Sequence, residues 1–326
     1  MSGTDPGRTD RVEGVLLGGA CGDALGVPYE FGSAPLATGE APRMIGGGLG
    51  PYEPGEWSDD TQMAVVIARA AADVGLRTAA GLDAVVEGWL GWLRDGATDV
   101  GNQTRWVLSE VAANESAQLS DDARLASDAL HARTGHTAGN GSLMRTAPVA
   151  LAFLDDPVAL TERARTISGL THADPLAGDA CVLWCHAVRR AVLDGAMPDL
   201  AWFVDEIPSA RREQWAGWIA EAERSTPARF SPNGFVVAAL QAAWSAVRHP
   251  VGDGPPLTAS LHAAVHAGND TDTVAAIAGA LLGAAHGASA LPAEWVEAVH
   301  GWPGLWADDL CDLARRVAGR GSDVSP

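Results

Sequence analysis

Two short stretches of the sequence concentrate side chains that could ligate a cation through oxygen. Residues 58–61 read Ser-Asp-Asp-Thr, and residues 270–273 read Asp-Thr-Asp-Thr. Each stretch leads into small apolar residues, as a buried helix would. A single stretch of this kind is typical of a helix N-cap, which needs only one side-chain acceptor. Neighbouring carboxylates repel each other unless protons or cations compensate them, so two such stretches favour bound hard cations.

The ligand types exclude some metal sites. An EF-hand that began at Asp270 would need Gly at position six and Glu at position twelve, where the chain has Ala275 and Leu281. Zinc would require a convincing Cys and His set, but Cys181 and Cys185 lie in an apolar helical segment and are interpreted as buried thiols. A carboxylate-bridged pair of Mg²⁺ or Mn²⁺ ions fits oxygen ligands best.

The elements that must position these groups are predicted to be helices. Ala-rich segments with helical periodicity recur at residues 61–74, 177–193, 235–247 and 273–287. No alternating strand pattern and no βαβ rhythm is found, which argues against a Rossmann or TIM arrangement. Gly279 and Gly283 lie at helical spacing and would let two helix backbones approach closely. The prediction is a compact all-α multi-helix bundle.

One domain is predicted over residues 1–326, with frayed tails at about 1–10 and 319–326. A Gly- and Pro-rich segment at residues 32–55 interrupts the helical pattern. A loop of this length inside a compact domain is usually functional or disordered. Because it lies between two motif-bearing segments, it is a candidate lid.

Composition limits the partners and the chemistry. The 326 residues carry a net charge of -19, which argues against nucleic acid or an anionic membrane as the main partner. No apolar segment is long enough to span a bilayer and the N-terminus does not read as a signal peptide, so a soluble cytoplasmic protein is expected. The chain has no lysine, which excludes a Schiff-base lysine, a pyridoxal phosphate anchor and a P-loop lysine.

Five motifs, taken in order, resemble the ADP-ribosylglycohydrolase family, which includes the dinitrogenase-reductase-activating glycohydrolases and the ADP-ribosyl-acceptor hydrolases. They are Gly22–Gly26 with Glu30, Ser58–Thr61, Gly139–Arg145, Thr171–Pro175 and Asp270–Thr273. Each motif alone is a weak signal, but their common order covers most of the chain. The resemblance implies an all-α orthogonal bundle with two Mg²⁺ or Mn²⁺ ions in a central cleft.

The resemblance also implies a ligand set for these ions. The implied ligands are Ser58, Asp59 and Asp60 from one side, and Asp270, Asp272 and Thr273 from the other. Thr61 and Thr271 would cap the helices or orient the carboxylates beside them. Asp23 is interpreted as structural, holding its own glycine-rich turn through backbone hydrogen bonds.

Two further acids are candidates for proton transfer. Glu30 resembles a family glutamate on a mobile flap near the metals, with a solvated loop acid as the alternative. Asp99 is similar to a base that faces the distal ribose in some members, with a helix cap as the alternative.

The remaining candidates would contact the nucleotide. Gly139, Asn140, Gly141 and Ser142 would supply backbone N–H groups for the pyrophosphate. His172 would hydrogen-bond the ligand or be held by Asp174. Phe235 would pack on the adenine or be a plain core residue, and Arg145 would brace the glycine-rich loop.

The implied activity is metal-dependent hydrolysis of the glycosidic bond at the anomeric carbon of the distal ribose in an ADP-ribosylated substrate. The substrate would be an ADP-ribosylated protein or small molecule, with arginine slightly favoured as the acceptor, and a monomer is expected. Two alternatives stay open. One is a non-catalytic relative that binds ADP-ribose or is structural. The other is a metal-dependent phosphoesterase that cuts the pyrophosphate and releases AMP.

Overall fold

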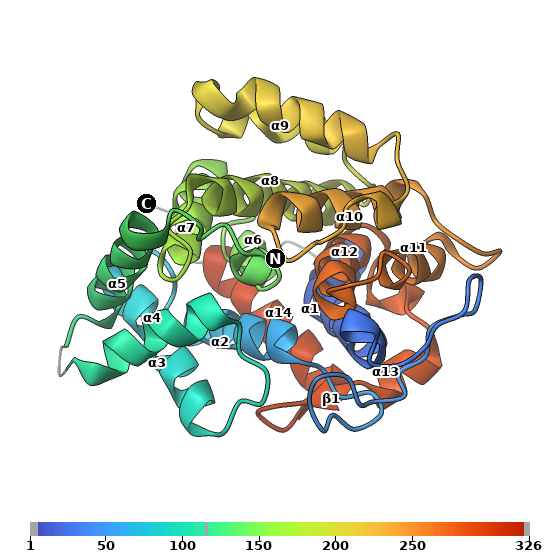
Figure 1. The fold of residues 1–326 in the computed structure, drawn as a ribbon, viewed down its shortest axis with the longest axis horizontal. Coiled ribbons are helices and arrows are strands. Elements are labelled where there is room, and N and C mark those ends of the chain that lie inside the picture. Colours follow the sequence, from blue (N-terminus) through green and yellow to red (C-terminus); the bar gives the residue numbers. More distant parts are fainter. Residues whose placement is uncertain (1–5, 115–116, 323–326) are drawn as a thin grey trace.

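The structure is a computed structural model that describes residues 6–114 and 117–322, and these residues form an almost wholly helical assembly (Figure 1). The α-helices are α1 (Pro6–Gly26), α2 (Asp59–Asp73), α3 (Ala79–Arg94), α4 (Asn102–Ala113), α5 (Leu119–Thr134), α6 (Ala147–Ala152), α7 (Pro157–Gly169), α8 (Pro175–Asp194), α9 (Ser209–Ala222), α10 (Val236–Arg248), α11 (Pro256–Val265), α12 (Thr271–His286), α13 (Ala293–Ala298) and α14 (Ala307–Ser322). Short 3₁₀ helices are η1 (Val27–Gly32), η2 (Asn140–Ser142), η3 (Leu200–Glu206), η4 (Pro227–Arg229) and η5 (Ala288–Ala290). Two antiparallel strands of two residues each, β1 (His300–Gly301) and β2 (Leu305–Trp306), complete the list.

The prediction of an all-α bundle is therefore confirmed, but the predicted tails were too long. Helix α1 begins at Pro6 and α14 continues to Ser322. Asp10 accepts hydrogen bonds from the backbone N–H and the hydroxyl of Ser289, which fixes the first turns of α1. Arg320 donates to two backbone carbonyls at the end of α2, which fixes the last turns of α14. Residues 1–5 and 323–326 lie outside the described residues.

Helices α1 and α12 pack with their backbones almost in contact, because glycines face each other along both helices. A Cβ added at Gly22 would lie 2.1 Å from the carbonyl oxygen of Ala275, and one added at Gly283 would lie 1.8 Å from that of Gly14. Gly279 meets Gly18 in the same way. Any larger residue at these positions would push the helices apart. The close approach predicted for Gly279 and Gly283 is confirmed, and it brings the end of α1 against the start of α12.

Helix α12 is the centre of the bundle. Every residue from Thr271 to Ala285 is buried, with α1 on one side and α8, α10 and α11 packed on the others. A helix that is buried all round can be apolar on every face. This explains why the sequence after the acids of α12 has no polar stripe.

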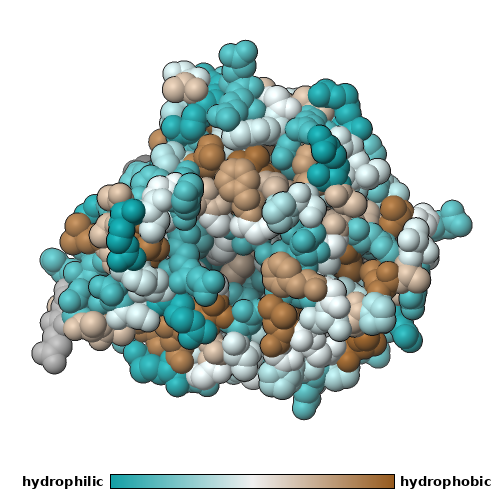
Figure 2. Space-filling model, viewed as in Figure 1, coloured by the Kyte–Doolittle hydropathy of each residue, from teal (hydrophilic) through white to brown (hydrophobic). Residues whose placement is uncertain are grey.

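Residues 33–55 contain no helix in the described structure, and their only regular pairing is an isolated bridge between Gly47 and Tyr52. The face seen in Figure 2 is largely hydrophilic, with hydrophobic residues in small separate groups. Among the described residues, no helix combines the length and apolar character that crossing a membrane would require.

Candidate active site

A cavity of about 450 Å³ brings most of the predicted site residues together. Its walls include Glu30, Asp59, Asp99, Gly139, Asn140, Gly141, His172, Asp270, Asp272 and Thr273. Segments far apart in the chain thus meet at one place, where the N-terminal ends of α2 and α12 approach the end of α1.

Asp23 of α1 holds the start of α2. One of its carboxylate oxygens accepts from the backbone N–H and hydroxyl of Ser58, at 2.9 and 2.7 Å. The other accepts from the backbone N–H and hydroxyl of Thr61, at 2.9 and 2.6 Å. The prediction that Asp23 holds its own glycine-rich turn was therefore wrong, because the residue lies inside α1 and caps a different helix. Because Asp23 caps the start of α2, the carboxylates of Asp59 and Asp60 are not needed to cap it.

The alternative interpretation, that the stretches at residues 58–61 and 270–273 serve only as helix N-caps, does not agree with the structure. Neither Ser58 at the N-cap of α2 nor Asp270 at the N-cap of α12 makes a side-chain capping hydrogen bond. Thr271 donates its hydroxyl to the carbonyl of Gly26, which ties α12 to the end of α1 and differs from the predicted role of capping the helix or orienting a carboxylate.

Around Ser58 there are more carboxylate oxygens than the neighbouring hydroxyl groups can donate hydrogen bonds to. The hydroxyl of Ser58 lies 2.7 Å from Asp23, 3.3 Å from Asp60 and 3.2 Å from Asp272, but it can donate to only one of them. Thr273 donates to the same oxygen of Asp60, at 3.3 Å. The Oδ1 atoms of Asp60 and Asp272 are buried and have no hydrogen-bond partner. Such atoms are costly unless protons or cations satisfy them.

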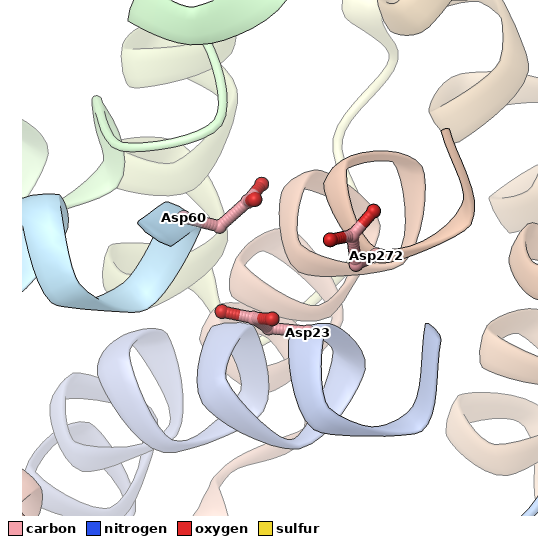
Figure 3. A group of neighbouring side chains, drawn as sticks. All are labelled: Asp23, Asp60 and Asp272. Atoms are coloured by element: carbon pink, nitrogen blue, oxygen red, sulfur yellow. The ribbon is translucent and has the colours of Figure 1, made fainter. Parts of the chain in front are cut away.

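Two groups of three carboxylates meet here and share one member. Asp23, Asp60 and Asp272 offer oxygen atoms within 4.8 Å of one another, and Figure 3 shows them projecting from three different helices around a common space. Glu30 and Asp270 form a second such group, again with Asp272. Asp59 belongs to neither group and lies on the cavity wall.

The surroundings favour the neutral form of these acids in the absence of a cation. Burial raises the pKa of Asp59, Asp60 and Asp272 well above the ordinary range, and the neighbouring carboxylates raise it further. For Glu30, burial and then the charges of Asp99 and other acids raise the pKa to about 9. No lysine is available to offset these charges, since the chain has none.

The donor set fits a hard divalent cation. All the convergent groups are carboxylate or hydroxyl oxygens, which Mg²⁺ and Mn²⁺ prefer, and two of the carboxylate oxygens lack any other partner. The four cysteines are elsewhere: Cys21, Cys181 and Cys185 are buried thiols, and Cys311 is half-buried. The interpretation of Cys181 and Cys185 as core thiols is confirmed.

Glu30 and Asp99 both face the cavity. The backbone carbonyl of Glu30 accepts from the N–H and hydroxyl of Ser33, which fixes the turn that carries it. Asp99 does not cap the helix that follows it, because α4 begins at Asn102 with Gly101 at its N-cap. Burial raises the pKa of Asp99, and the charge of Asp270 adds to that effect.

The glycine-rich turn is joined to the acids through an asparagine pair. Asn140 donates to Asp270 at 2.8 Å and to the carbonyl of Asn233 at 3.1 Å. The side-chain oxygen of Asn233 accepts from the backbone N–H of Asp270, and its amide donates to Gly268. Asn233 was not among the predicted site residues, because a Pro-Asn-Gly stretch is typical of any turn.

His172 lines the cavity, with its ring against the glycine-rich turn. A Cβ added at Gly141 would lie 3.2 Å from its Nε2 atom. Its Nδ1 atom lies 2.7 Å from the hydroxyl of Thr171, which also accepts from Arg145 at 2.6 Å. The alternative that Asp174 holds His172 was wrong, because Asp174 accepts from Leu176 at the N-cap of α8.

Arg145 itself is buried and lies 4.1 Å from the centroid of the Trp89 ring. Through Thr171 it fixes the segment that carries His172. The bracing role predicted for Arg145 therefore acts on the neighbouring His172 loop.

Two predicted nucleotide contacts are placed outside the cavity wall. The side chain of Ser142 is buried, and its hydroxyl accepts from Ser168 at 2.9 Å. Phe235 is 43% exposed at the N-cap of α10, so the alternative of a core residue was wrong. It pairs with Gly139 through an isolated backbone bridge, beside Gly234 on the wall.

Comparison with known proteins shows the family of this chain. A sequence model of the ADP-ribosylglycohydrolase family matches residues 4–325. This protein belongs to the ADP-ribosylglycohydrolase family. The family resemblance inferred from five motifs is confirmed.

Three relatives illustrate the membership. The ADP-ribosylarginine hydrolase Tri1 of Pseudomonas putida (strain GB-1) is 31% identical over 97% of this chain and 80% of that protein. The ADP-ribosyl-(dinitrogen reductase) glycohydrolase of Rhodospirillum rubrum is 29% identical over 90% of this chain and 91% of that protein. A solved structure described as an ADP-ribosylglycohydrolase-related protein complex superposes with a TM-score of 0.75, at 28% identity, over 96% of this chain and 99% of that one.

Proposed function

We propose that this protein is a metal-dependent hydrolase that removes ADP-ribose from an ADP-ribosylated acceptor, with arginine as the favoured acceptor. The observation that carries the proposal is the pair of unpartnered buried oxygens on Asp60 and Asp272, of which Asp272 lines a cavity that also holds a glycine-rich turn. The names of two relatives, one an arginine hydrolase and one a dinitrogen reductase glycohydrolase, support the class of reaction.

The residues that would hold two Mg²⁺ or Mn²⁺ ions are Ser58, Asp59, Asp60, Asp270, Asp272 and Thr273. Asp272 supports a count of two, because it belongs to both groups of three acids. When bound, the ions would supply Lewis-acid chemistry and the positive charge that an acidic protein needs near a diphosphate.

A carboxylate beside the distal ribose would move the proton. Glu30 is the first candidate, because its carboxyl lies beside Asp270 and Asp272 and its surroundings raise its pKa to about 9. A carboxyl with a raised pKa keeps its proton near neutral pH, so Glu30 would donate that proton as a general acid. Asp99 is the second candidate, since it faces the same cavity. Either acid would assist a glycosidic cleavage with an oxocarbenium-like transition state.

The nucleotide would lie along the other part of the wall. Backbone N–H groups of the turn at residues 139–142 would bind the pyrophosphate, which needs no lysine. His172 would donate a hydrogen bond to the same group, and exposed Phe235 would pack on the adenine. Residues 32–55 would act as a lid over the site, since Leu49 from this segment lines the cavity. We propose that the protein works as a monomer.

A panel of ADP-ribosylated substrates tests the proposal. Arginine-, serine- and acetyl-linked ADP-ribose are each incubated with the metal-free protein and with added Mg²⁺ or Mn²⁺, and the products are separated by chromatography. We expect free ADP-ribose, fastest from the arginine-linked substrate and only with metal. AMP as the product would indicate a phosphoesterase, whereas ADP-ribose binding without turnover would indicate a non-catalytic relative.

A further inference from the structure

Phe31 and Leu49 are two apolar residues that line the active-site cavity while remaining largely exposed. Phe31 is 60% exposed and Leu49 is 55% exposed, and both are part of the same wall as Glu30 and Asp99. An exposed large apolar side chain on a polar cavity loses the free energy that burial would give it. A ligand group that covers these side chains would recover it.

The backbone of Phe31 is held in a conformation that residues other than glycine rarely adopt. Its φ angle is 46°, in the left-handed region that is costly for a residue with a Cβ. Its backbone N–H donates to the carbonyl of Asn269 at 2.7 Å, and Asn269 also has a positive φ, of 59°. Strain of this kind persists where the surrounding structure enforces it, and it concentrates at functional sites. Here the strained residue follows Glu30 in the chain and lines the same cavity.

The chemistry of this wall selects one kind of acceptor. Phe31 and Leu49 offer apolar surface, and Asp99 and Glu30 offer carboxylates on the same cavity. A ligand group that is complementary to both the apolar surface and the carboxylates must have an aliphatic stem that ends in a cation or a strong hydrogen-bond donor. The arginine side chain has this form, and its planar guanidinium stacks on aromatic faces. Serine and acetate have no such stem.

We propose that Phe31 and Leu49 form the acceptor subsite and bind the aliphatic stem of an ADP-ribosylated arginine. The inference rests on the proposed hydrolase function and adds the residues that choose the acceptor. Phe31 and Leu49 are specificity residues, and neither takes part in proton transfer.

A pair of substrates that differ only in the stem tests this assignment. ADP-ribosylagmatine keeps the methylene chain beyond the guanidine, whereas ADP-ribosylguanidine lacks it, and the bond that breaks is the same type in both. For the wild-type protein with Mg²⁺, we expect kcat/KM to be about tenfold higher for the agmatine substrate, equivalent to roughly two buried methylene groups. In Phe31→Gly with Leu49→Ala, the ratio should fall to about one.

The variants are chosen to keep the protein folded, so that a change in the ratio of kcat/KM values reports on substrate binding. Glycine at position 31 tolerates the left-handed backbone, so Phe31→Gly should keep or raise Tm. Phe31→Tyr should retain most of the preference. The matched control is Trp202→Ala in η3, which removes another exposed aromatic, 64% exposed and outside the cavity wall, and should leave the ratio unchanged.

Three results would overturn the assignment. The first is a wild-type ratio near one, and the second is a tenfold ratio that persists in the double variant. The third is weaker binding of free ADP-ribose by Phe31→Gly with the substrate ratio unchanged, which would place the ring on the nucleotide. If the wild-type protein releases ADP-ribose from neither substrate, arginine is not the acceptor and the inference falls; release from the serine- or acetyl-linked substrate then decides whether the proposed hydrolase function stands.

Discussion

Two places in this protein bury carboxylates, and they satisfy them in opposite ways. Asp179 of α8 is fully buried, and its oxygens accept from Arg165 at 2.6 Å, from two nitrogens of Arg211, and from Trp215 at 3.3 Å. At the candidate active site, Asp60 and Asp272 are also buried, but each keeps one oxygen without a partner, and no arginine pairs with either among the described residues.

The difference shows what each cluster is for. Asp179 joins α7, α8 and α9 through protein groups alone, and every bond it makes is internal. Near Asp60 and Asp272, the hydroxyls of Ser58, itself held by Asp23, and of Thr273 lie within hydrogen-bond distance, yet one oxygen of each acid has no partner in the protein. In the stabilising site the buried carboxylate has protein hydrogen-bond partners, whereas in the binding site some buried carboxylate oxygens have none.

Replacing an acid of the cavity should have the largest effect. We expect Asp272→Asn to reduce ADP-ribose release by about 10³-fold or more, because a shared cation ligand is removed. The metal-free variant should be at least as stable as the wild-type protein, because burial forces Asp272 to take up a proton near neutral pH, whereas an amide needs none. Activity assays and urea unfolding in EDTA measure the two effects. Full activity in Asp272→Asn, or in Asp59→Asn, would refute the ligand assignment for that residue.

Replacing Asp179 should reduce the stability of the protein and leave its activity unchanged. Asp179→Asn leaves Arg165 and Arg211 without their carboxylate, which we expect to cost about 2 kcal/mol of unfolding free energy, a value reduced from the fully buried case because both arginines are partly exposed. Activity per folded molecule and metal affinity should stay at wild-type values. A variant that unfolds normally but loses its metal would contradict the separation of the two sites.

Asp23 lies between these cases and sharpens the comparison. Asp23→Asn keeps the shape but exchanges acceptors for an amide that cannot accept all four bonds from Ser58 and Thr61. We expect metal affinity to fall about 10- to 100-fold, as for other residues that orient ligands, with a smaller loss of stability. Calorimetric titration with Mn²⁺ measures the affinity. An unchanged affinity would mean that α2 keeps its position without this cap.

The smallest predicted effect is a pH dependence of the metal-free protein. The pKa of Glu30 is raised to about 9, and those of Asp60 and Asp272 are raised as well, so stability from these groups is present at low pH and is lost as the pH rises toward 9. In EDTA we expect Tm to fall by several degrees between about pH 5 and 8.5, and to fall less in Asp272→Asn. Saturating Mg²⁺ should remove the decline, because the cation binds the ionised acids. Equal declines in both proteins would assign the effect to other groups.

The sequence was sufficient for the helical fold and for the acids that line the cavity, whose roles stay predictions. Helical periodicity predicted the bundle, and the helical spacing of Gly279 and Gly283 predicted a close approach of two helices, although not that α1 would be the partner of α12. The five ordered motifs led to the family, which the family match confirms. The metal, its count and the individual roles of Glu30 and Asp99 stay predictions.

The errors came from contacts between distant segments. Asp23 was expected to serve its own turn, but the packing of α1 on α12 places it under α2, 35 residues away. Asn233 was missed because nothing local distinguishes an asparagine that holds Asp270 from an ordinary turn residue. The tails were expected to fray because the sequence does not reveal that Asp10 and Arg320 hold them against other helices.

The central claim is that the acids between α1, α2 and α12 hold divalent cations, and anomalous scattering tests it most directly. Crystals of the wild-type protein grown with Mn²⁺ are measured near the manganese absorption edge. The account predicts two peaks that share Asp272, one beside Asp60 and one beside Asp270. No peak at these carboxylates, or peaks only elsewhere on the acidic surface, would contradict it.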